Sequence, residues 1–316
     1  MTRASERAFR EAVLDALGYA PESIDPGRLH RFATSERRND SAGWCKLFDD
    51  CRGGVFGCHR QGIHETWTAV DRHTLSRAQR IALARQVAAA AAEREAQQRQ
   101  QWTANKQRIA SLWAQCVPLV PGDPVTLYLK RRGIGEVWPR PAVLRLHPAL
   151  PYWYEGETLG TFPAMVAPIV APDGRTVALH RTYLTADGRK ADVPSPKKLT
   201  VAAGPLAGAC IPLHKPERGC IGIAEGIETA LAAWCASGVP TVAAYCAGNL
   251  AACRWPAGVQ RLVIFADADK AGREAADRLR ARARSHRLSC VVMTPSDDGA
   301  DWCDVWASRL AVEVSA

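Results

Sequence analysis

The sequence predicts an α/β protein with a parallel sheet in its carboxyl-terminal third, and three observations support this prediction. The apolar, β-branched runs at residues 262–266 and 289–293 lack polar alternation, as strands buried on both faces do. Residues 227–237 and 272–286 have helical spacing, so strands and helices form βαβ units with right-handed crossovers. Each apolar run is followed by acidic residues and a new helix.

The acidic residues fall where a parallel sheet places its functional crevice. Glu225 ends the run that starts at Cys220, and Asp267 and Asp269 end the run that starts at Leu262. Because the crevice lies outside the carboxyl ends of such strands, these carboxylates would repel one another unless a cation lay between them. Oxygen ligands at this density favour Mg²⁺ or Mn²⁺, ions that hold substrate phosphates during an in-line displacement.

The alternative is that Asp267 and Asp269 only cap the helix that starts near Ala271, which is a common role of Asp. That interpretation gives no role to Glu225, which lies on a separate strand. It also leaves unexplained the acidic segment ADWCDVW near the end of the chain, which contains Asp301 and Asp304.

Two motifs carry a resemblance to a known family. EGIETALAAW, which starts at Glu225, and FADADKAGREAA, which contains Asp267 and Asp269, resemble the Toprim domain shared by bacterial primases and topoisomerases. The resemblance implies that Glu225 serves in general acid–base or metal chemistry and that the two aspartates bind a divalent metal. EGIETA with RTYL upstream is most similar to the primase-type Toprim proteins of phages, plasmids and other mobile elements.

The third acidic motif departs from the family pattern. Toprim primases commonly have Lys-Asp-x-Asn-Asp here, whereas this chain has Ala300 in the Lys place and Cys303 in the Asn place. Asp301 and Asp304 are therefore secondary metal candidates, and Asp304 has a helix cap as its alternative role.

The bulk composition limits the class of protein. With 316 residues the chain can hold two or three domains, and its net charge of +9 favours a polyanionic partner. We expect no membrane association, since no apolar run approaches a membrane span and the start MTRASERAFREAV does not have the pattern of a signal peptide. Eleven scattered cysteines indicate reduced thiols and a cytoplasmic location.

Residues 1–74 are predicted to form a small β-rich domain. Phe9, Val13, Leu14 and Leu17 give one face of a helix that Gly18 ends, and short strands with polar turns follow. GRLHRF, GWCKLFDD and GGVFGC resemble the amino-terminal domain of mobile-element primases. The resemblance implies the shape of a zinc ribbon that lacks its ligands.

The same domain contains a group of cysteines and histidines that raises the question of zinc. The spacing Cys-x5-Cys-x6-Cys-His includes no Cys-x2-Cys pair, which structural zinc sites usually show, so we expect no zinc here. The group consists of Cys45, Cys51, Cys58, His59 and His64.

The domain also has the composition of a module that contacts nucleic acid. Its basic residues supply charge for phosphates. Trp44, Phe48, Phe56 and Trp67 could stack on bases, although core packing is the better interpretation for most of them. The basic residues are Arg28, His30, Arg31, Arg37, Arg38, Lys46, Arg52 and Arg60.

Residues 75–116 are rich in Ala, Gln, Arg and Glu without Gly or Pro, which predicts a long helical linker. Residues 117–216 are predicted to be mixed α/β, with a helix that ends at Gly133 and hairpin turns at Asp173-Gly174 and Asp187-Gly188. The resemblance implies that they form the primase-core subdomain that precedes Toprim. Residues 217–316 form the Toprim domain, where Gly248 and Asn249 are expected in a tight turn.

Basic residues of the middle region are candidates for holding nucleotide or template. Arg181 is the first choice, because a guanidinium fixed on a strand can fork a phosphate. The other candidates are Lys197, Lys198, Lys130, Arg132 and, beside the acids, Lys270. Arg131 and Arg132 have an alternative role as charges that favour the carboxyl end of a helix.

These observations predict a DNA primase-like nucleotidyltransferase. It would use Mg²⁺ or Mn²⁺, nucleoside triphosphates and a single-stranded DNA template to make short RNA primers for a phage, plasmid or other mobile element. The chain has no Gly-x4-Gly-Lys-Ser/Thr loop, so a replicative helicase would be a separate protein. A Toprim-type nuclease and a non-catalytic nucleic-acid-binding protein remain as alternatives.

Overall fold

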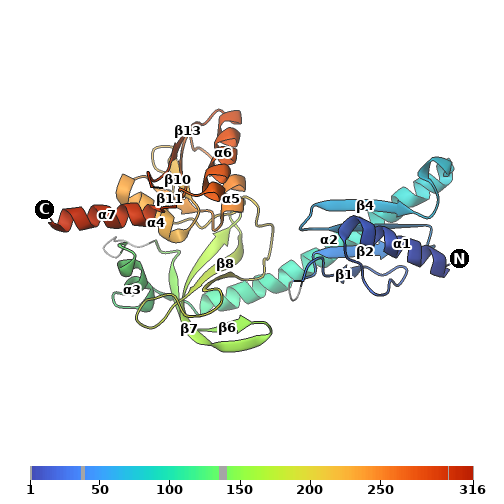
Figure 1. The fold of residues 1–316 in the computed structure, drawn as a ribbon, viewed down its shortest axis with the longest axis horizontal. Coiled ribbons are helices and arrows are strands. Elements are labelled where there is room, and N and C mark those ends of the chain that lie inside the picture. The colour runs from blue at the N-terminus through green and yellow to red at the C-terminus, as the bar shows by residue number, and fades with distance from the viewer. Residues whose placement is uncertain (1, 37–39, 135–140, 298, 316) are drawn as a thin grey trace. The chain divides into compact units, whose positions relative to one another are not determined.

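The computed structural model describes residues 2–36, 40–134, 141–297 and 299–315 (Figure 1). It divides into two compact units, Met1–Gln101 and Trp102–Ala316, and the boundary falls inside helix α2 (Arg77–Ala114). α2 is the long helix that the composition of residues 75–116 predicted. The finer domain limits at residues 74, 116 and 216 stay predictions, and Arg37 and Arg38 lie outside the described residues.

The first unit is a four-stranded antiparallel sheet between two helices. Its strands are paired in the order β1-β2-β3-β4. They are preceded by α1 and followed by the short 3-10 helix η1 and then α2. The bounds are α1 (Thr2–Leu17), β1 (His30–Phe32), β2 (Gly43–Leu47), β3 (Gly53–Cys58), β4 (Ile63–Thr68) and η1 (Arg72–Thr74).

The two faces of this sheet are covered by different helices. Phe9, Val13 and Leu17 of α1 are buried in one core, while Leu14 is 40% exposed and does not belong to the buried face, contrary to our expectation. The buried residues recur every fourth position, and Leu14 lies about 100° around the helix from Val13. On the other face, α2 packs against a second core that includes Trp44.

The second unit begins with an antiparallel sheet in the order β5-β6-β7-β8-β9. One face packs against the last turns of α2, and the other face shares a core with α3 and with the parallel sheet. Asp123 caps α3, because its Oδ1 accepts a hydrogen bond of 2.7 Å from the backbone N–H of Thr126. The bounds are β5 (Val117–Pro118), α3 (Pro124–Arg131), β6 (Arg145–Tyr154), β7 (Glu157–Val170), β8 (Thr176–Tyr183) and β9 (Lys197–Leu199).

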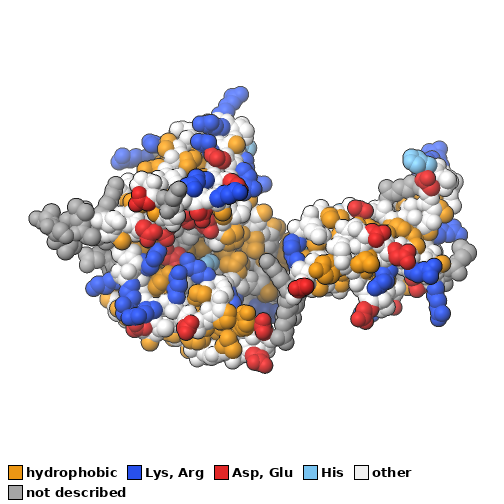
Figure 2. Space-filling view, viewed as in Figure 1, with side chains coloured by type: hydrophobic (Ala, Val, Ile, Leu, Met, Phe, Trp, Pro, Cys, Tyr) orange, Lys and Arg blue, Asp and Glu red, His pale blue; other side chains and the backbone are white. Residues whose placement is uncertain are grey.

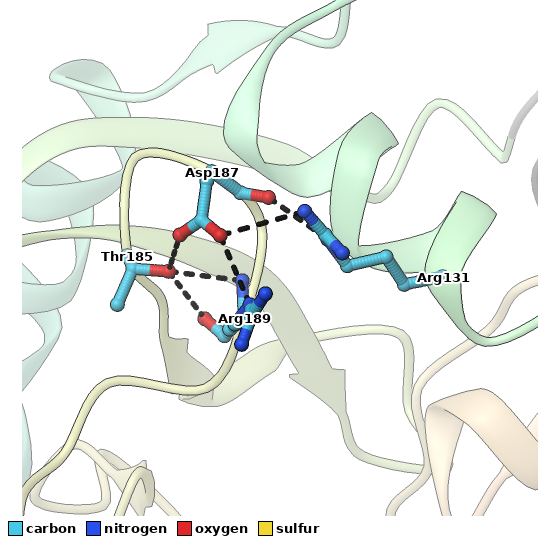
Figure 3. Close-up of polar contacts among 4 residues, drawn as sticks. All are labelled: Arg131, Thr185, Asp187 and Arg189. Carbon is cyan, nitrogen blue, oxygen red and sulfur yellow. Dashed lines mark hydrogen bonds and ion pairs between the residues drawn. The ribbon is translucent and has the colours of Figure 1, made fainter.

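The predicted turn at Asp187-Gly188 is present and is fixed by polar contacts (Figure 3). Thr185 Oγ1 donates to Asp187 Oδ1 at 2.5 Å, and Arg189 Nε lies 3.0 Å from Asp187 Oδ2. Arg131 reaches over from α3, and its Nε donates to the backbone carbonyl of Asp187 at 3.0 Å. Arg131 therefore joins α3 to this turn.

The parallel sheet follows, with strand order β11-β10-β12-β13. Helices α4 and α7 share the core on one face, and α5 and α6 share the core on the other (Figure 1). The predicted α/β class, with antiparallel sheets before a carboxyl-terminal parallel sheet, is confirmed. The bounds are β10 (Cys220–Ala224), α4 (Ile227–Ser237), β11 (Thr241–Ala243), α5 (Ala247–Ala252), β12 (Arg261–Phe265), α6 (Lys270–Ser285), β13 (Ser289–Met293) and α7 (Trp302–Ser315).

Two local predictions in this region are wrong. Ser289–Met293 is not buried on both faces, because β13 is an edge strand, and Val291 and Met293 are 42% and 38% exposed. Gly248 and Asn249 form part of α5 rather than a tight turn. The buried Asn249 side chain accepts from the backbone N–H of Gly208 at 2.9 Å and donates to the carbonyl of Ala244 at 3.1 Å.

Within the part of the chain that the structure describes, no helix combines the length and the apolar character needed to cross a membrane.

Gly222 in β10 allows a close packing contact that a substitution will test. An added Cβ would lie 2.8 Å from Phe265 Cε2 and 2.8 Å from Thr241 Cγ2, and both of these residues are fully buried. We expect Gly222→Ala to lower the free energy of unfolding by about 1–3 kcal/mol through overpacking. Gly248→Ala is the control, because its Cβ would meet nothing within 4 Å. Urea unfolding that finds the two variants equally stable would contradict this account.

Candidate functional site

The predicted acids lie at the topological switch point of the parallel sheet. β10 pairs with β11 on one side and with β12 on the other, and the chain forms β11 before it crosses to β12. Glu225 directly follows β10, and Asp267 lies two positions after the end of β12. Open α/β sheets bind ligands in the crevice at such a point. The fold therefore brings together two acids that are 42 positions apart in the sequence.

The carboxylates interact across this crevice. Burial and the Asp269 carboxylate raise the pKa of Glu225. Burial raises the pKa of Asp267 to about 7, with further contributions from the carboxylates of Glu225, Asp301 and Asp269. Asp267 Oδ1 is buried and has no hydrogen-bond partner among the described residues. An unpartnered acid in a crowd of acids is stabilised by a bound cation.

Asp301 joins the group through the loop before α7. The backbone N–H groups of Gly299 and Ala268 donate to the carbonyls of Ala268 and Ala300 at 2.8 and 3.0 Å, so this loop runs beside the segment between Asp267 and α6. Asp301 Oδ2 accepts from Arg132 Nη2 at 3.2 Å. The third acidic segment thus approaches the first two.

Asp304 has a different role. Its Oδ2 accepts from the backbone N–H of Asp301 at 3.0 Å, and Asp301 Oδ1 accepts from the backbone N–H of Asp304 at 3.0 Å. This reciprocal pair is a capping box for α7. Asp304 therefore has the alternative role that the sequence allowed, as part of the cap of a helix.

A cavity of about 180 Å³ opens between these segments. Figure 2 shows acidic side chains on one face of residues 102–316 with Lys and Arg side chains beside them. Four carboxylates and three cations line the cavity, so groups of opposite charge lie together within a small volume. The lining residues are Tyr128, Arg132, Lys190, Lys197, Glu225, Gly226, Glu228, Thr229, Asp267 and Asp301.

Glu228 is a site residue that the sequence analysis missed. Its side chain is 6% exposed, Oε1 accepts from the Tyr128 hydroxyl at 2.6 Å, and Oε2 lies 2.9 Å from Lys197 Nζ. Burial alone would raise the pKa of Glu228. The charge of Lys197 and the two hydrogen bonds outweigh burial and hold this pKa at about 2. The second Glu of EGIETA was the available signal, but its partner Tyr128 lies a hundred positions away.

Lys197 connects Glu228 with the acids of the switch point. Burial raises the pKa of Glu225 and of Asp267, and the ammonium group of Lys197 offsets part of this rise. Among the basic residues predicted to hold nucleotide, Lys197 and Arg132 line the cavity. Lys190 lines it as well and was not predicted.

Three predicted basic residues have other surroundings. Arg181 points to the face of β8 opposite His180, and its Nη2 donates to the carbonyl of Leu199 at 2.6 Å. Lys198 Nζ donates to the carbonyl of Trp153 at 2.6 Å. Lys130 is exposed in the last turn of α3. The structure does not bring these three side chains to the cavity.

Asp269 and Lys270 lie at the start of α6, outside the cavity lining. Asp269 Oδ1 accepts from the backbone N–H of Gly272 at 2.6 Å, so the cap role holds for Asp269 but not for Asp267. Lys270 is exposed in the first turn of the same helix.

The described residues include no group of three or more His, Cys, Asp and Glu side chains placed to hold a metal ion. Glu225, Asp267 and Asp269 therefore interact without forming a closed ligand set.

The Cys/His group of the first unit is largely built into its core. Cys45, Cys51 and Cys58 are buried and packed around Phe9 and Phe56. Trp44, Phe48 and Phe56 are at most 3% exposed, so core packing is the correct interpretation for these aromatics.

Asp267 provides a stability test of the carboxylate crowding. Its carboxyl ionises near pH 3.8 when unconstrained but near 7 in the folded protein, so its ionisation destabilises the fold as pH rises between these values. We expect Asp267→Asn to raise the free energy of unfolding by about 1 kcal/mol at pH 8 and by nearly nothing at pH 4. The gain at pH 8 is no larger because the carboxyl group is partly exposed and solvent screens its charge. Urea unfolding in EDTA measures this. A gain of equal size at both pH values would contradict the crowding.

Lys197 provides the converse test. Lys197→Met leaves the buried Glu228 carboxylate without its counter-charge, and we expect a loss of about 2 kcal/mol at pH 7. The loss should shrink toward pH 4, because Glu228 then protonates more readily in the variant than in the wild type, where its pKa is about 2. Lys198→Met, which changes the same charge one position away, is the control. Thermal unfolding across this pH range should show the pH-dependent loss in the first variant only.

Two segments of the chain match known protein families. Residues 220–311 match the Toprim domain, and residues 103–212 match a domain of unknown function (DUF7146). No curated protein matches the chain.

Several solved structures are similar to the chain. A DNA primase domain from Pseudomonas aeruginosa is 16% identical over 52% of this chain and 54% of its own length, with a TM-score of 0.36. The primase fragment of the bacteriophage T7 primase-helicase protein is 14% identical over 59% and 68%, with a TM-score of 0.36. A DnaG primase catalytic domain bound to ssDNA is 17% identical over 69% and 81%, with a TM-score of 0.45.

The chain thus spans about half of the length of the Pseudomonas primase domain. The motifs around Glu225 and Asp267, the four-stranded parallel sheet and the family match over residues 220–311 agree with one another. The chain therefore contains a Toprim domain at residues 220–311, as its motifs predicted.

Proposed function

We propose that this protein is a DNA primase-like nucleotidyltransferase that synthesises short RNA primers on single-stranded DNA. The observation that supports this most directly is the cavity at the switch point, where Glu225 and Asp267 face Lys197, Arg132 and Lys190. Carboxylates for a divalent metal and cations for phosphates are the two requirements of phosphoryl transfer. The similarity to primase structures and the net charge of +9 agree with the proposal.

The residues present fit a divalent metal. Mg²⁺ usually takes one or two carboxylates and fills its other positions with water and substrate phosphates, so an incomplete protein ligand set is suitable. The buried Oδ1 of Asp267, which has no hydrogen-bond partner in the part of the chain that the structure describes, is the atom best placed to gain from a cation. Glu225, Asp267 and Asp269 would hold the ion, and Asp301 stands near them as a further acid. The ion would stabilise charge that develops on the transferred phosphoryl group.

The chain's own cations would orient the substrate. Lys197 is fixed by the buried Glu228, so its ammonium group stays at the cavity wall and can contact a phosphate oxygen. Arg132 presents a guanidinium that can contact two phosphate oxygens at once, once it leaves or shares Asp301. Glu225, whose pKa is raised by burial and by Asp269, is suited to accept a proton from an attacking hydroxyl group near neutral pH.

A template would bind through its phosphate backbone to basic residues of the second unit, and its affinity would fall with salt. We further propose that the protein acts in replication of a phage, plasmid or other mobile element. It would work with a separate helicase and be located in the cytoplasm. These proposals are supported by the resemblance of EGIETA and RTYL and by the bulk composition.

A priming assay tests the function. Purified full-length protein is incubated with single-stranded DNA, four labelled ribonucleoside triphosphates and Mg²⁺ or Mn²⁺. We expect short labelled oligonucleotides from the wild type and a loss of at least about a hundredfold in Asp267→Asn and in Glu225→Gln, because each removes charge from the metal site.

Asp277→Asn is the matched control, since Asp277 is exposed on α6 and pairs only with Arg280 among the described residues. It should retain wild-type synthesis. Metal-dependent loss of the template without synthesis would establish a Toprim nuclease in place of a primase. DNA binding with neither activity would contradict an enzyme and indicate a nucleic-acid-binding protein.

A further inference from the structure

One row of residues across the sheet of the first unit places a tryptophan beside an arginine and a histidine. Arg31 of β1 pairs with Trp44 of β2, Trp44 pairs with Gly57 of β3, and Gly57 pairs with His64 of β4. Residues directly opposite one another in an antiparallel sheet point to the same face. Arg31, Trp44 and His64 therefore share a face, and the glycine between them leaves space for the indole.

The indole of Trp44 fills this space. An added Cβ on Gly57 would lie 2.8 Å from Trp44 Cζ2, so the ring covers the glycine. The Trp44 ring centroid lies 5.3 Å from that of His64 and 6.4 Å from that of His59. Both imidazoles thus surround the edge of one buried aromatic side chain.

Helix α2 adds a second arginine to the same place. Leu83, Val87 and Ala90 pack against the sheet at helical spacing, and Arg94 occupies the next position of this stripe. Arg94 Cζ lies 3.8 Å from the centroid of the Trp44 ring. Arg94 therefore occupies a position where the spacing of Leu83, Val87 and Ala90 predicts another apolar side chain.

The two guanidinium groups donate to the two imidazoles. Arg31 Nη1 lies 2.9 Å from His59 Nε2, and Nη1 and Nη2 of Arg94 each lie 3.4 Å from His64 Nε2. Burial lowers the pKa of His59, and the charges of Arg31 and Arg94 lower it further. Four basic groups thus converge, with imidazoles as the acceptors for both arginines.

Three carboxylates of this unit are already engaged with other cations. Asp40 binds Arg60, Glu93 binds Lys46, and Glu95 lies 3.4 Å from Arg99. Within the described ranges of this unit, neither Arg31 nor Arg94 forms an ion pair with a carboxylate. The cluster of Arg31, His59, His64 and Arg94 has an excess of positive charge that a bound anion would offset.

We propose that this cluster is a binding site for a phosphate group. Two guanidinium groups match the oxygens of a phosphate, and the exposed imidazole rings border a solvent-accessible side of the cluster. The phosphate can come from a nucleic-acid backbone or from a free nucleotide or inorganic phosphate. Trp44 is only 2% exposed, so it supports Arg94 and does not stack on a base. The site lies within Met1–Gln101 and does not depend on the activity proposed for the Toprim domain.

NMR of histidine ring signals in the full-length protein tests this site without reference to catalysis. We expect added inorganic phosphate to shift the His59 and His64 signals more than those of the remaining histidines, whereas sodium chloride at equal ionic strength should not. The double variant Arg31→Gln, Arg94→Gln should lose these shifts. Its affinity for an oligothymidylate or for phosphate should fall about tenfold, as expected when charged hydrogen bonds are removed.

Arg3→Gln with Arg7→Gln is the matched control, since both residues are exposed, belong to the same unit and remove the same charge. Its affinity should stay within about twofold of the wild type. If the double Gln variant proves unstable, a second variant, Arg31→Lys with Arg94→Lys, replaces it. This variant retains the charge but not the planar guanidinium donors, so it should bind with intermediate affinity.

The arms of the experiment also separate the two sources of phosphate. Tighter binding of the oligothymidylate than of inorganic phosphate or ATP supports a backbone site, and the reverse order supports a site for free phosphate. The proposal is overturned if chloride shifts the same signals as phosphate. It is also overturned if the control double variant loses as much affinity as the cluster variant, or if no phosphate compound shifts the two signals.

Discussion

The contact between Lys197 and Glu228 is the interaction on which the candidate site depends. Glu228 is a buried carboxylate, and it remains ionised because Lys197 lies 2.9 Å away and the Tyr128 hydroxyl donates to its other oxygen. The same ammonium group offsets part of the rise that burial causes in the pKa of Glu225 and Asp267. One cation thus supports a residue of the core and moderates the repulsion among residues of the cavity. A change at Lys197 therefore acts on the stability of the fold and on the chemistry of the cavity together.

The sequence predicts the features that are local along the chain. Each Toprim acid follows an apolar strand and precedes a helix, so short motifs suffice to place Glu225 and Asp267 at the same edge of the sheet. The contacts that complete the site join distant segments: Tyr128 with Glu228 and Arg132 with Asp301. Neither pair has a periodicity or spacing that a single sequence reveals. Successive side chains of a strand point to opposite faces, so Lys197 lies at the cavity while the neighbouring Lys198 points away from it.

Two wrong local predictions, the strand at Ser289–Met293 and the turn at Gly248-Asn249, also have a physical origin. The run at Ser289–Met293 is apolar enough for a central strand, but strand order is a property of the whole sheet, and this strand became an edge. Gly248 and Asn249 have the composition of a turn, yet the three backbone contacts of the buried Asn249 side chain stabilise a short helix instead. In both cases tertiary structure outweighs local preference.

The two units share one physical feature, which is charge that the fold itself does not neutralise. In the Toprim domain the pKa of Asp267 is raised to about 7, and within the described ranges its buried Oδ1 has no hydrogen-bond partner. In the first unit Arg31 and Arg94 donate to imidazoles in place of carboxylates. A fold selected only for stability would pair or remove these groups, because each costs free energy in the unliganded protein. The two charges have opposite signs, so the ligands proposed for them differ: a metal cation would offset the acids of the second unit, and a phosphate anion would offset the arginines of the first.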